Sequence, residues 1–418
     1  MSKSNSSQRK NRANVYLDYA SSALLQHANP GAIHELGVKE KNKLKNARAI
    51  VAKILNVRND EIIFTSGATE SNNLAIGGLI QNFKKPHIVT TNIEHASILE
   101  VCRHLEKTKQ AEVTYVKVEQ SGIVNLKKIK KALKKNTVLV SVMYANNEIG
   151  TVEPVKEIGK LIRHFNKINS QKIFFHTDAT QAINYLPINI PQLGVDLMSF
   201  NGAKIYGPKG IGVLYIKKNT PISKIMFGGD QEFGLRPGTE NVALAMELAK
   251  ALQITEKIKV KETKHLTKLR DYFIKKLITS QKNNFLGSSG EDTRPLENHS
   301  SAPFIINGDL KNRLPNNINI TIPNIPSDLL VIELSEKGIM TSSKSACKSS
   351  SAEGSYVIRA LRSKIGLPAE ALAEEGGVRF SLGRQTTKAD IDYTVKSLSE
   401  ILTKLKKWYT PTPIFYLK

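Results

Sequence analysis

The stretch S-F-N-G-A-K-I-Y-G-P-K-G, residues 199–210, is the one around which the rest of the chain is organised. It continues a short apolar run, 195–200, that is typical of a buried strand, and its glycines predict a turn with an unusual backbone path. Lys204 lies in that turn, where the mouth of a sheet is expected. A lysine desolvated in such a cleft can form a Schiff base with a carbonyl. On this stretch alone an ordinary surface lysine is the simpler interpretation, and the remaining sequence decides between the two.

Length and composition set the class of protein. The chain has 418 residues, which favours two domains, and 40% of them are hydrophobic. No apolar run approaches the roughly 18 residues that a membrane helix needs. Residues 1–14 are basic and serine-rich, which predicts a flexible tail, with a short vestigial transit peptide as the alternative. Two cysteines, Cys102 and Cys347, indicate a reducing cytoplasm and neither a disulfide framework nor a metal cluster.

The charge of the chain is strongly positive. Its 61 Lys and Arg against 37 Asp and Glu give a net charge of +24. Such a balance favours acidic partners, either nucleic acid or an acidic protein. The lysines are scattered along helical faces, as in 39–45 and 127–131, and no aromatic residues alternate with them. We therefore expect no direct binding of nucleic acid.

Predicted strands and helices alternate along the first part of the chain. Strands are expected at 61–64, 87–91, 113–118, 138–143, 173–176, 197–200 and 212–216. Helices are expected at 37–55, 98–107, 126–134, 155–166 and 241–254. Polar residues follow several strands, at 94–95, 146–147, 176–178 and 201–204. This α/β pattern predicts a mainly parallel sheet between helices, with a ligand beyond the carboxyl ends of the strands.

The composition changes after about Glu256. A lysine-rich helix is expected at 265–278, followed by a polar stretch without predicted structure at 280–301. Further strands are expected at 318–322 and 378–382, and further helices at 329–337 and 389–407. A loop of small residues, 341–355, carries Cys347. We therefore predict a large cofactor-binding domain over 15–256 and a small α+β domain over 257–418 that carries the cysteine loop.

A candidate phosphate site lies in T-S-G-A-T-E-S-N-N-L-A-I, residues 65–76. Here a strand turns through Gly67 into a helix, and the free N–H groups of the helix start, with hydroxyls such as that of Thr69, form an anion cradle. No G-K-[ST] follows, so it is not a Walker loop.

Pyridoxal phosphate would use such a cradle together with three other groups. It needs a lysine, an acid against the pyridine nitrogen and a partner on the ring face. Lys204, Asp178 and His95 are the candidates, and Gln181 can donate to the ring hydroxyl. Taken singly, Asp178 is equally well a helix cap and His95 a core histidine. Together, these residues at successive strand ends favour the cofactor site.

Ten stretches form an ordered set from Tyr16 to about Trp408. They are Y-L-D-Y-A, F-T-S-G-A-T-E-S-N-N-L-A-I, E-H-A-S-I, N-N-E-I-G, H-T-D-A-T-Q, V-D-L-M-S-F-N-G-A-K-I-Y-G-P-K-G, R-P-G-T-E-N, L-P-N-N-I-N, S-S-K-S-A-C and V-R-F-S-L-G-R. Together they resemble the cysteine desulfurases, pyridoxal-phosphate enzymes of fold-type I in the class V aminotransferase-like group. The S-A-C loop is similar to that of the housekeeping branch, which serves iron–sulfur cluster biogenesis and tRNA thiolation.

The resemblance implies a role for each candidate. It makes Lys204 the lysine that carries pyridoxal 5'-phosphate, and His95 the residue stacked on the ring. The residues implied to bind the cofactor are Lys204, Ala68, Thr69, His95, Asn147, Asp178, Gln181, Asn201 and, from the partner subunit of a homodimer, Thr239. Arg379, together with Asn147, is the implied clamp for the substrate carboxylate, a role that a bidentate guanidinium suits.

The implied reaction converts L-cysteine to L-alanine, with Cys347, Lys204 and His95 as catalytic residues. The Cys347 thiolate attacks the substrate sulfur and keeps it as a persulfide, and Lys344 and Lys348 assist its ionisation. The sulfur then passes to an acceptor protein, such as an iron–sulfur scaffold or a tRNA-thiolation relay protein, and Cys347 can transiently ligate an iron–sulfur cluster. Two alternatives stay open: a same-fold lyase or aminotransferase that does not use Cys347, and a non-catalytic sulfur-trafficking subunit.

Cys102 has a different predicted role from Cys347. It lies on a predicted helix with Leu99 and Leu105, so we expect a core cysteine.

Three features depart from the family pattern. Asn201 and Ala203 stand where the family usually has a serine and a histidine that contact the phosphate. Asn201 can still donate a hydrogen bond but the side chain of Ala203 cannot, so we expect weaker cofactor retention. The stretch 21–30 is shorter than usual near the substrate entrance, and 288–309 is longer.

Overall fold

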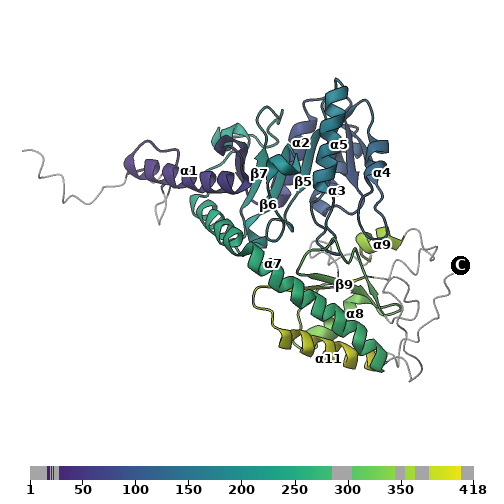
Figure 1. Ribbon diagram of the computed structural model, residues 1–418. Helices are drawn as coiled ribbons and strands as arrows, with labels where there is room; N and C mark the ends of the chain where they lie inside the picture. The colour runs from purple at the N-terminus through teal and green to yellow at the C-terminus, as the bar shows by residue number, and fades with distance from the viewer. Residues whose placement is uncertain are drawn as a thin grey trace, which may run out of the picture.

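The computed structural model describes residues 17–18, 20, 22, 28–284, 304–343, 354–362 and 376–405. Figure 1 shows a large part built around one sheet and a smaller part built around another, with one long helix running between them. The tail 1–14, residues 23–27, most of 288–309 and the loop residues 344–353 with Cys347 lie outside the described residues.

The large sheet has seven strands in the order β1-β7-β6-β5-β4-β2-β3. They are β1 (Ile62–Thr65), β2 (His87–Thr91), β3 (Glu112–Val116), β4 (Thr137–Ser141), β5 (Phe174–Asp178), β6 (Leu197–Asn201) and β7 (Gly212–Ile216). Strands β3, β2, β4, β5 and β6 are parallel, and β7 is antiparallel to both β6 and β1. All strands except β7 therefore end at the same edge, which confirms the predicted mainly parallel sheet.

Alternate residues of the strands face two separate hydrophobic cores, as the two-residue repeat of a strand requires. One core contains Val89, Val140, Phe175, Met198 and Val213. It is covered by α1 (Glu35–Leu55), α5 (Val155–Ile168) and α7 (Val242–Asn284). The other core contains Ile88, Leu139, Phe174, Leu197 and Leu214. It is covered by α2 (Ala68–Ile80) and α3 (Ala96–Lys107), so helices lie on both faces as predicted.

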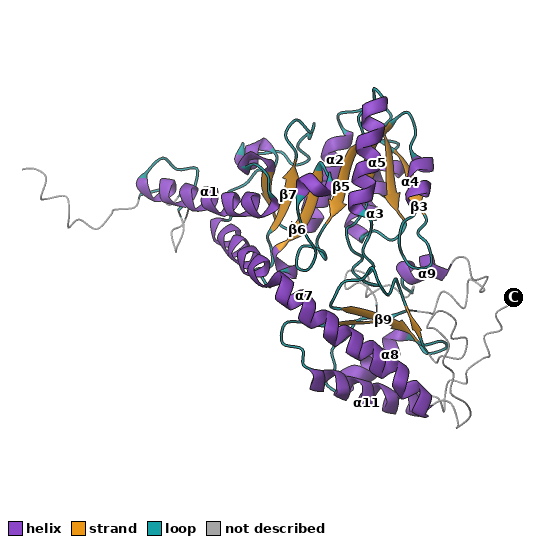
Figure 2. Ribbon diagram, in the orientation of Figure 1, coloured by secondary structure: helices purple, strands orange, loops and turns teal. Residues whose placement is uncertain are grey.

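Helix α7 is one continuous helix of 43 residues, which Figure 2 shows passing from the large part to the small part. The prediction of two helices, 241–254 and 265–278, with a break between them is therefore wrong, as is the absence of structure at 280–284. Thr255, Lys259 and Glu262 lie buried on the inner face between Leu252 and Leu266. Because polar residues occupy the buried face there, the apolar period that marks a helix is hidden in the sequence.

The small part is built on a three-stranded antiparallel sheet in the order β10-β9-β8. Its strands are β8 (Ile305–Ile306), β9 (Asn317–Thr321) and β10 (Val378–Ser381), and its helices are α8 (Ser327–Glu336), α9 (Tyr356–Arg362) and α11 (Lys388–Leu405). The rings of Phe273 in α7 and Phe380 in β10 meet edge-on, with centroids 5.1 Å apart. The predicted small α+β layout is present, while the boundary at 256 remains a prediction because α7 runs through it.

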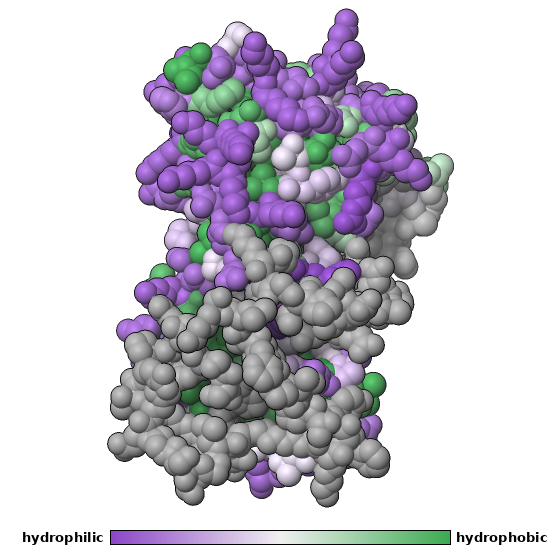
Figure 3. Space-filling model, turned by 90° about the vertical axis from the view of Figure 1, so that its right-hand side faces the viewer, coloured by the Kyte–Doolittle hydropathy of each residue, from purple (hydrophilic) through white to green (hydrophobic). Residues whose placement is uncertain are grey.

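The surface of the large part is mostly polar on the side that carries helix α4 (Leu126–Ala132). Figure 3 shows hydrophilic residues over most of the large part in that view. Lys127, Lys130 and Lys131 of α4 are exposed, as expected for lysines scattered on helical faces. In the part of the chain that the structure describes, no helix has the length and apolar character needed to cross a membrane.

Candidate active site

The ends of the parallel strands bring most of the candidate residues to one edge of the large sheet. The strand register places Thr65 of β1 beside Gly212 of β7, and Gly212 beside Asn201 of β6. Asp178, the last residue of β5, pairs with Ser199 of β6. The segments that follow these strands carry the candidates at 67–69, 95, 147, 178–181 and 201–204. This edge is where open α/β sheets bind their ligands.

The predicted phosphate cradle is formed by Gly67, Ala68 and Thr69 at the start of helix α2. Gly67 is the N-cap, and the first N–H groups of a helix have no acceptor within it. A Cβ added to Gly67 would meet nothing within 4 Å, so this side of the turn is open. A Cβ on Gly212 would lie 2.6 Å from the Gly67 Cα, so only a glycine lets β7 pass so close. Open space next to unpaired N–H groups suits a phosphate.

Asp178 and His95 are joined by a chain of hydrogen bonds through Asn72 of α2 and Ser97 of α3. The Asn72 Nδ2 of α2 donates to Asp178 Oδ2 at 2.9 Å and to Ser97 Oγ at 2.8 Å. Ser97 Oγ lies 2.9 Å from His95 Nδ1. Asp178 Oδ1 also accepts from the N–H of Thr180 at 2.9 Å. The carboxylate is 6% exposed, so these donors fix its orientation at the mouth of the sheet.

The proton position on His95 follows from its contacts. His95 is the N-cap of α3, and its Nδ1 accepts from the backbone N–H of Ser97 at 3.1 Å. A backbone N–H can only donate, so Nδ1 is an acceptor and the neutral ring carries its proton on Nε2. His95 is half-buried. It is therefore both a helix cap and a candidate proton carrier with Nε2–H as its available group.

Arg379 and Asn147 meet where the small part contacts the large part. The Arg379 Nη1 donates to the backbone oxygen of Asn147 at 2.8 Å. Burial lowers the pKa of the Arg379 guanidinium, and the negative charge of Glu148 opposes that shift. Arg379 Nε and Asn147 Oδ1 are both buried without a hydrogen-bond partner. Buried unpaired groups of this kind are costly, so a donor and an acceptor here indicate a site for a polar ligand with a carboxylate.

Lys204 ends a single turn of 3-10 helix, Gly202–Lys204, directly after β6. The backbone N–H of Lys204 donates to Asn201 Oδ1 at 3.2 Å. The side-chain oxygen of Asn201 therefore stabilises the turn that carries the lysine. Lys204 and Ala203 are exposed. The candidate lysine therefore directly follows β6, at the edge of the sheet where the strand ends carry the other candidates.

Gln181 and Thr239 lie at the margin of this group. Gln181 is half-buried, just beyond Asp178, and Thr239 is exposed on the segment between β7 and α7. Arg236 of that segment bonds Glu70 in the first turn of α2, with Nε and Oε1 3.0 Å apart. This ion pair ties Arg236, which precedes Thr239 in the same segment, to the first turn of α2. Cys347 is outside the described residues, so the structure does not place it.

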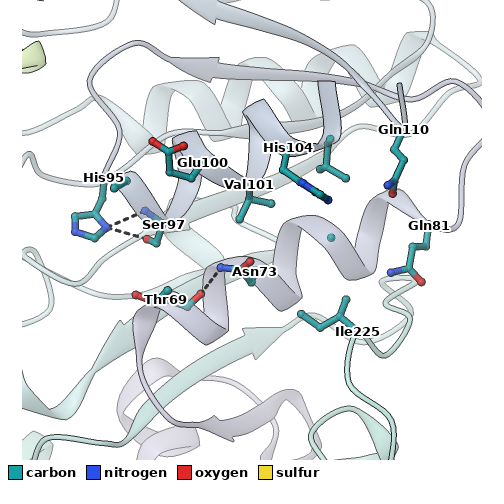
Figure 4. A pocket seen from close by; sticks show the side chains of 13 residues that line it. Thr69, Asn73, Gln81, His95, Ser97, Glu100, Val101, His104, Gln110 and Ile225 are labelled. Carbon is teal, nitrogen blue, oxygen red and sulfur yellow. Dashed lines mark hydrogen bonds between the residues drawn. The ribbon is translucent and has the colours of Figure 1, made fainter. Parts of the chain in front are cut away.

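A cavity of about 640 Å³ opens next to the cradle, between α2 and α3. Thr69 and His95 line one end and Gln81 and Gln110 the other, as Figure 4 shows. The side chain of Ile225, from the segment after β7, closes one wall. Of the candidate site residues, Thr69 and His95 line this cavity.

Two further titratable groups lie behind the site. Burial raises the pKa of the Glu94 carboxyl to about 8, although hydrogen bonds from the Met143 N–H and the Thr91 hydroxyl lower that pKa. Burial also raises the pKa of the Cys102 thiol to about 12, and the predicted core position of this residue is confirmed. Among the residues described, no group of three or more His, Cys, Asp or Glu side chains is arranged to hold a metal ion.

Asn72 and Ser97 are the residues that sequence reasoning missed. Both lie inside the quoted stretches, but neither was assigned a role. The available signal was a polar side chain at a position that the helical period assigns to the buried face of α2, where Asn72 has 0% exposure. Such a residue needs partners, and the structure shows that its partners are Asp178 and Ser97.

Comparisons with known sequences show the family of the chain. A family model described as aminotransferase class-V matches residues 13–298. Cysteine desulfurase IscS of Dictyoglomus turgidum is 40% identical over 408 residues, which cover 94% of this chain and 95% of the relative. Cysteine desulfurase IscS of Methanosarcina thermophila is 38% identical over 390 residues, which cover 93% and 88%.

Solved structures give the same result. A NifS-like protein matches with a TM-score of 0.76 and 34% identity, covering 90% of this chain and 92% of its own. SspA in complex with cysteine matches with a TM-score of 0.65 and 32% identity, covering 85% and 90%. The resemblance carried by the ten stretches is thereby confirmed. The chain belongs to the class-V aminotransferase family of pyridoxal-phosphate-dependent enzymes and, within it, to the cysteine desulfurases.

Proposed function

We propose that this protein converts L-cysteine to L-alanine and keeps the released sulfur as a persulfide on Cys347. The observation that carries the proposal is the hydrogen-bonded chain from Asp178 through Asn72 and Ser97 to His95, which lies beside the open cradle at Gly67. An acid, a ring partner and a phosphate site at one strand edge are the groups that pyridoxal phosphate needs.

The reaction balances without an external oxidant. The Cβ–S bond of the substrate breaks and a sulfur–sulfur bond to Cys347 forms. The carbon gains the two electrons that the two sulfur atoms lose, and one thiol hydrogen moves to that carbon. The products are alanine and a protein persulfide.

Each residue around the cofactor has a separate task in the proposal. Pyridoxal phosphate, when bound, supplies an electron-withdrawing ring that makes the substrate Cα acidic. Ala68 and Thr69 would hold its phosphate at the first turn of α2, and Asp178 would pair with its ring nitrogen. Lys204 Nζ takes the proton from the substrate Cα, and His95 Nε2 holds a proton next to the reacting sulfur. The remaining proposed cofactor contacts are Asn147, Gln181, Asn201 and, from the partner subunit, Thr239.

The substrate carboxylate is proposed to bind Arg379. The guanidinium is already held by the Asn147 backbone oxygen, and its Nε is a buried donor without a partner. A carboxylate accepts from such a group with the geometry and charge that Arg provides. Because Arg379 lies on β10 of the small part, substrate binding involves both parts of the chain.

The proposed oligomer is a homodimer in which Thr239 of the partner subunit reaches the cradle. Large apolar side chains lie exposed on the segment that leads to Thr239: Phe227 is 80% exposed, Phe233 59% and Met226 47%. Exposed residues of this size near a site are typical of a surface that another chain covers. A second copy would cover them and complete the phosphate site.

The proposed sulfur acceptor is an iron–sulfur scaffold or a tRNA-thiolation relay protein, and the proposed compartment is the cytoplasm. The net charge of +24 favours an acidic acceptor, because opposite charges steer association. Cys347 is the residue from which that acceptor would take sulfur.

Replacing Cys347 by serine tests the proposed function. The variant is expected to bind pyridoxal phosphate as the unchanged protein does, which the absorbance of the bound cofactor reports, and to release no sulfide from L-cysteine under reducing conditions. Full sulfide release by Cys347→Ser would instead identify a lyase or aminotransferase of the same fold. A protein that binds no cofactor at all would identify a non-catalytic sulfur-trafficking subunit.

A further inference from the structure

Two consecutive residues, Asn147 and Glu148, hold both described flanks of the segment that carries Cys347. In the sequence Cys347 lies between Ser342 and Ser355. Ser342 is connected to Asn147 through Arg379, and Ser355 bonds Glu148 directly. The two flanks therefore converge on neighbouring positions of the turn after β4.

The contact of Glu148 with the second flank is deeply buried. Ser355 Oγ donates to Glu148 Oε2 at 2.5 Å, and the two residues are 3% and 2% exposed. The same Oγ accepts from the backbone N–H of Ile358 at 3.2 Å, so Ser355 caps helix α9. A charge-assisted hydrogen bond in a buried site is strong and directional. Glu148 therefore fixes where α9 begins.

The first flank is joined to the substrate clamp. Ser342 and Arg379 exchange backbone hydrogen bonds, from Arg379 N to Ser342 O at 2.7 Å and from Ser342 N to Arg379 O at 3.3 Å. Arg379 Nη1 donates to the oxygen of Asn147. The backbone oxygen of Glu148 accepts from Asn317 Nδ2 at 3.2 Å and from Asn319 Nδ2 at 3.1 Å, both on β9. The Asn147–Glu148 turn is therefore tied to the strand beside the clamp.

Helix α9 also reaches the segment that precedes His95. The Tyr356 hydroxyl donates to the backbone oxygen of Glu94 at 2.5 Å. Asn146 Nδ2 donates to the oxygen of Ile93 at 2.9 Å, and Asn146 Oδ1 accepts from the N–H of Glu148 at 2.8 Å. The start of α9, the Glu148 turn and the His95 segment thus form one hydrogen-bonded unit.

We propose that Glu148 is a positioning residue for sulfur transfer. Through Ser355 it sets the C-terminal flank of the Cys347 segment against the turn that also holds Asn147 and Arg379. This role rests on the proposed function, because it has a consequence only if Cys347 receives the sulfur. Loss of the contact is expected to slow the transfer while cofactor and substrate binding are retained.

The test separates transfer from binding with Ser355→Ala, which removes the hydrogen bond and leaves the Glu148 charge in place. In single-turnover reactions with L-cysteine, the change in cofactor absorbance reports substrate binding, and mass analysis reports sulfur on Cys347. We expect sulfur transfer to slow by at least about tenfold, since the lost bond is to a charged group, with the concentration dependence of binding unchanged. Ser355→Thr keeps the hydroxyl and is expected to restore transfer.

The matched control is Asn125→Ala. Asn125 caps α4 as Ser355 caps α9, and both helices have seven residues, but α4 is far in the sequence from the Cys347 segment. If Ser355→Ala does not fold, Glu148→Asp gives the same test, because it keeps the charge and withdraws the acceptor by one methylene. Equal slowing in the control and in Ser355→Ala, or unchanged transfer in Ser355→Ala, would overturn the positioning role. Absence of sulfur on Cys347 in the unchanged protein would instead contradict the proposed function itself.

Discussion

Replacing Asn72 by alanine is expected to weaken the binding of pyridoxal phosphate without removing any residue that contacts it. Asn72 is fully buried, and its Nδ2 donates to both Asp178 Oδ2 and Ser97 Oγ. In the variant, Asp178 keeps the N–H of Thr180 but loses the donor that orients its second oxygen. The carboxylate must then be reoriented when the ring nitrogen binds.

The expected size follows from the bond that is lost. A hydrogen bond to a charged group contributes about 1.5–3 kcal/mol. At about 1.4 kcal/mol for each factor of ten, the dissociation constant should rise roughly 10- to 150-fold. The contact between Ser97 and His95 loosens as well, because Ser97 Oγ loses the Asn72 donor.

Titration of the cofactor-free protein with pyridoxal phosphate, followed by the absorbance of the bound cofactor, measures this effect. The neighbouring variant Asn73→Ala is the control, since the Asn73 Nδ2 donates to the more exposed Thr69 oxygen at 2.8 Å. Its dissociation constant should stay within about tenfold of the original value and below that of Asn72→Ala, because a bond between neutral groups contributes only about 0.5–1.5 kcal/mol. An Asn72→Ala protein that binds the cofactor normally, while Asp178→Ala does not, would refute the orienting role of Asn72.

Three further outcomes are expected. Ala203→His should lower the cofactor dissociation constant, and equal affinity of the two proteins in the same titration would contradict the weaker retention expected from Ala203. Arg379→Lys should raise the KM for L-cysteine by about tenfold or more with a smaller change in kcat, because lysine cannot form the bidentate contact; an unchanged KM in steady-state assays would remove Arg379 from the substrate site. Burial raises the pKa of Glu94 to about 8, from its ordinary value of 4.5. Between these two pH values the folded protein keeps a proton on Glu94 that the unfolded chain has released. The contribution of Glu94 to the free energy of unfolding therefore falls as pH rises toward 8. The difference in thermal stability between the original protein and Glu94→Gln should therefore move in favour of Glu94→Gln from pH 5 to pH 8, and a difference that does not vary with pH would argue against the shift.

The sequence predicted those parts of the fold that depend on local patterns. Each predicted strand of the large sheet is present with its ends within two residues of the prediction, because short apolar runs between turns mark buried strands directly. Helix α7 was missed as one element because Lys259 and Glu262 occupy its buried face. Arg384 pairs with Glu262, so the polar face is satisfied by a partner far away in the sequence.

The candidate site was predictable to the extent that its residues follow strand ends. Asp178, His95 and the cradle at 67–69 come together because parallel strands end at one edge. The contacts of Asn72 with Asp178 and of Glu148 with Ser355 depend on how segments far apart in the sequence pack together. No local sequence pattern predicts which of these segments come into contact. The roles of Lys204 and Thr239 toward the cofactor remain predictions.

The most direct test of the proposed chemistry is the fate of sulfur in a single anaerobic turnover with L-cysteine. Mass analysis should find one added sulfur on Cys347 for each alanine formed. Cys102 is the internal control, since burial raises the pKa of its thiol to about 12 and keeps it unreactive, and it should gain none. Alanine formed without added sulfur on Cys347 would contradict a persulfide mechanism at this residue.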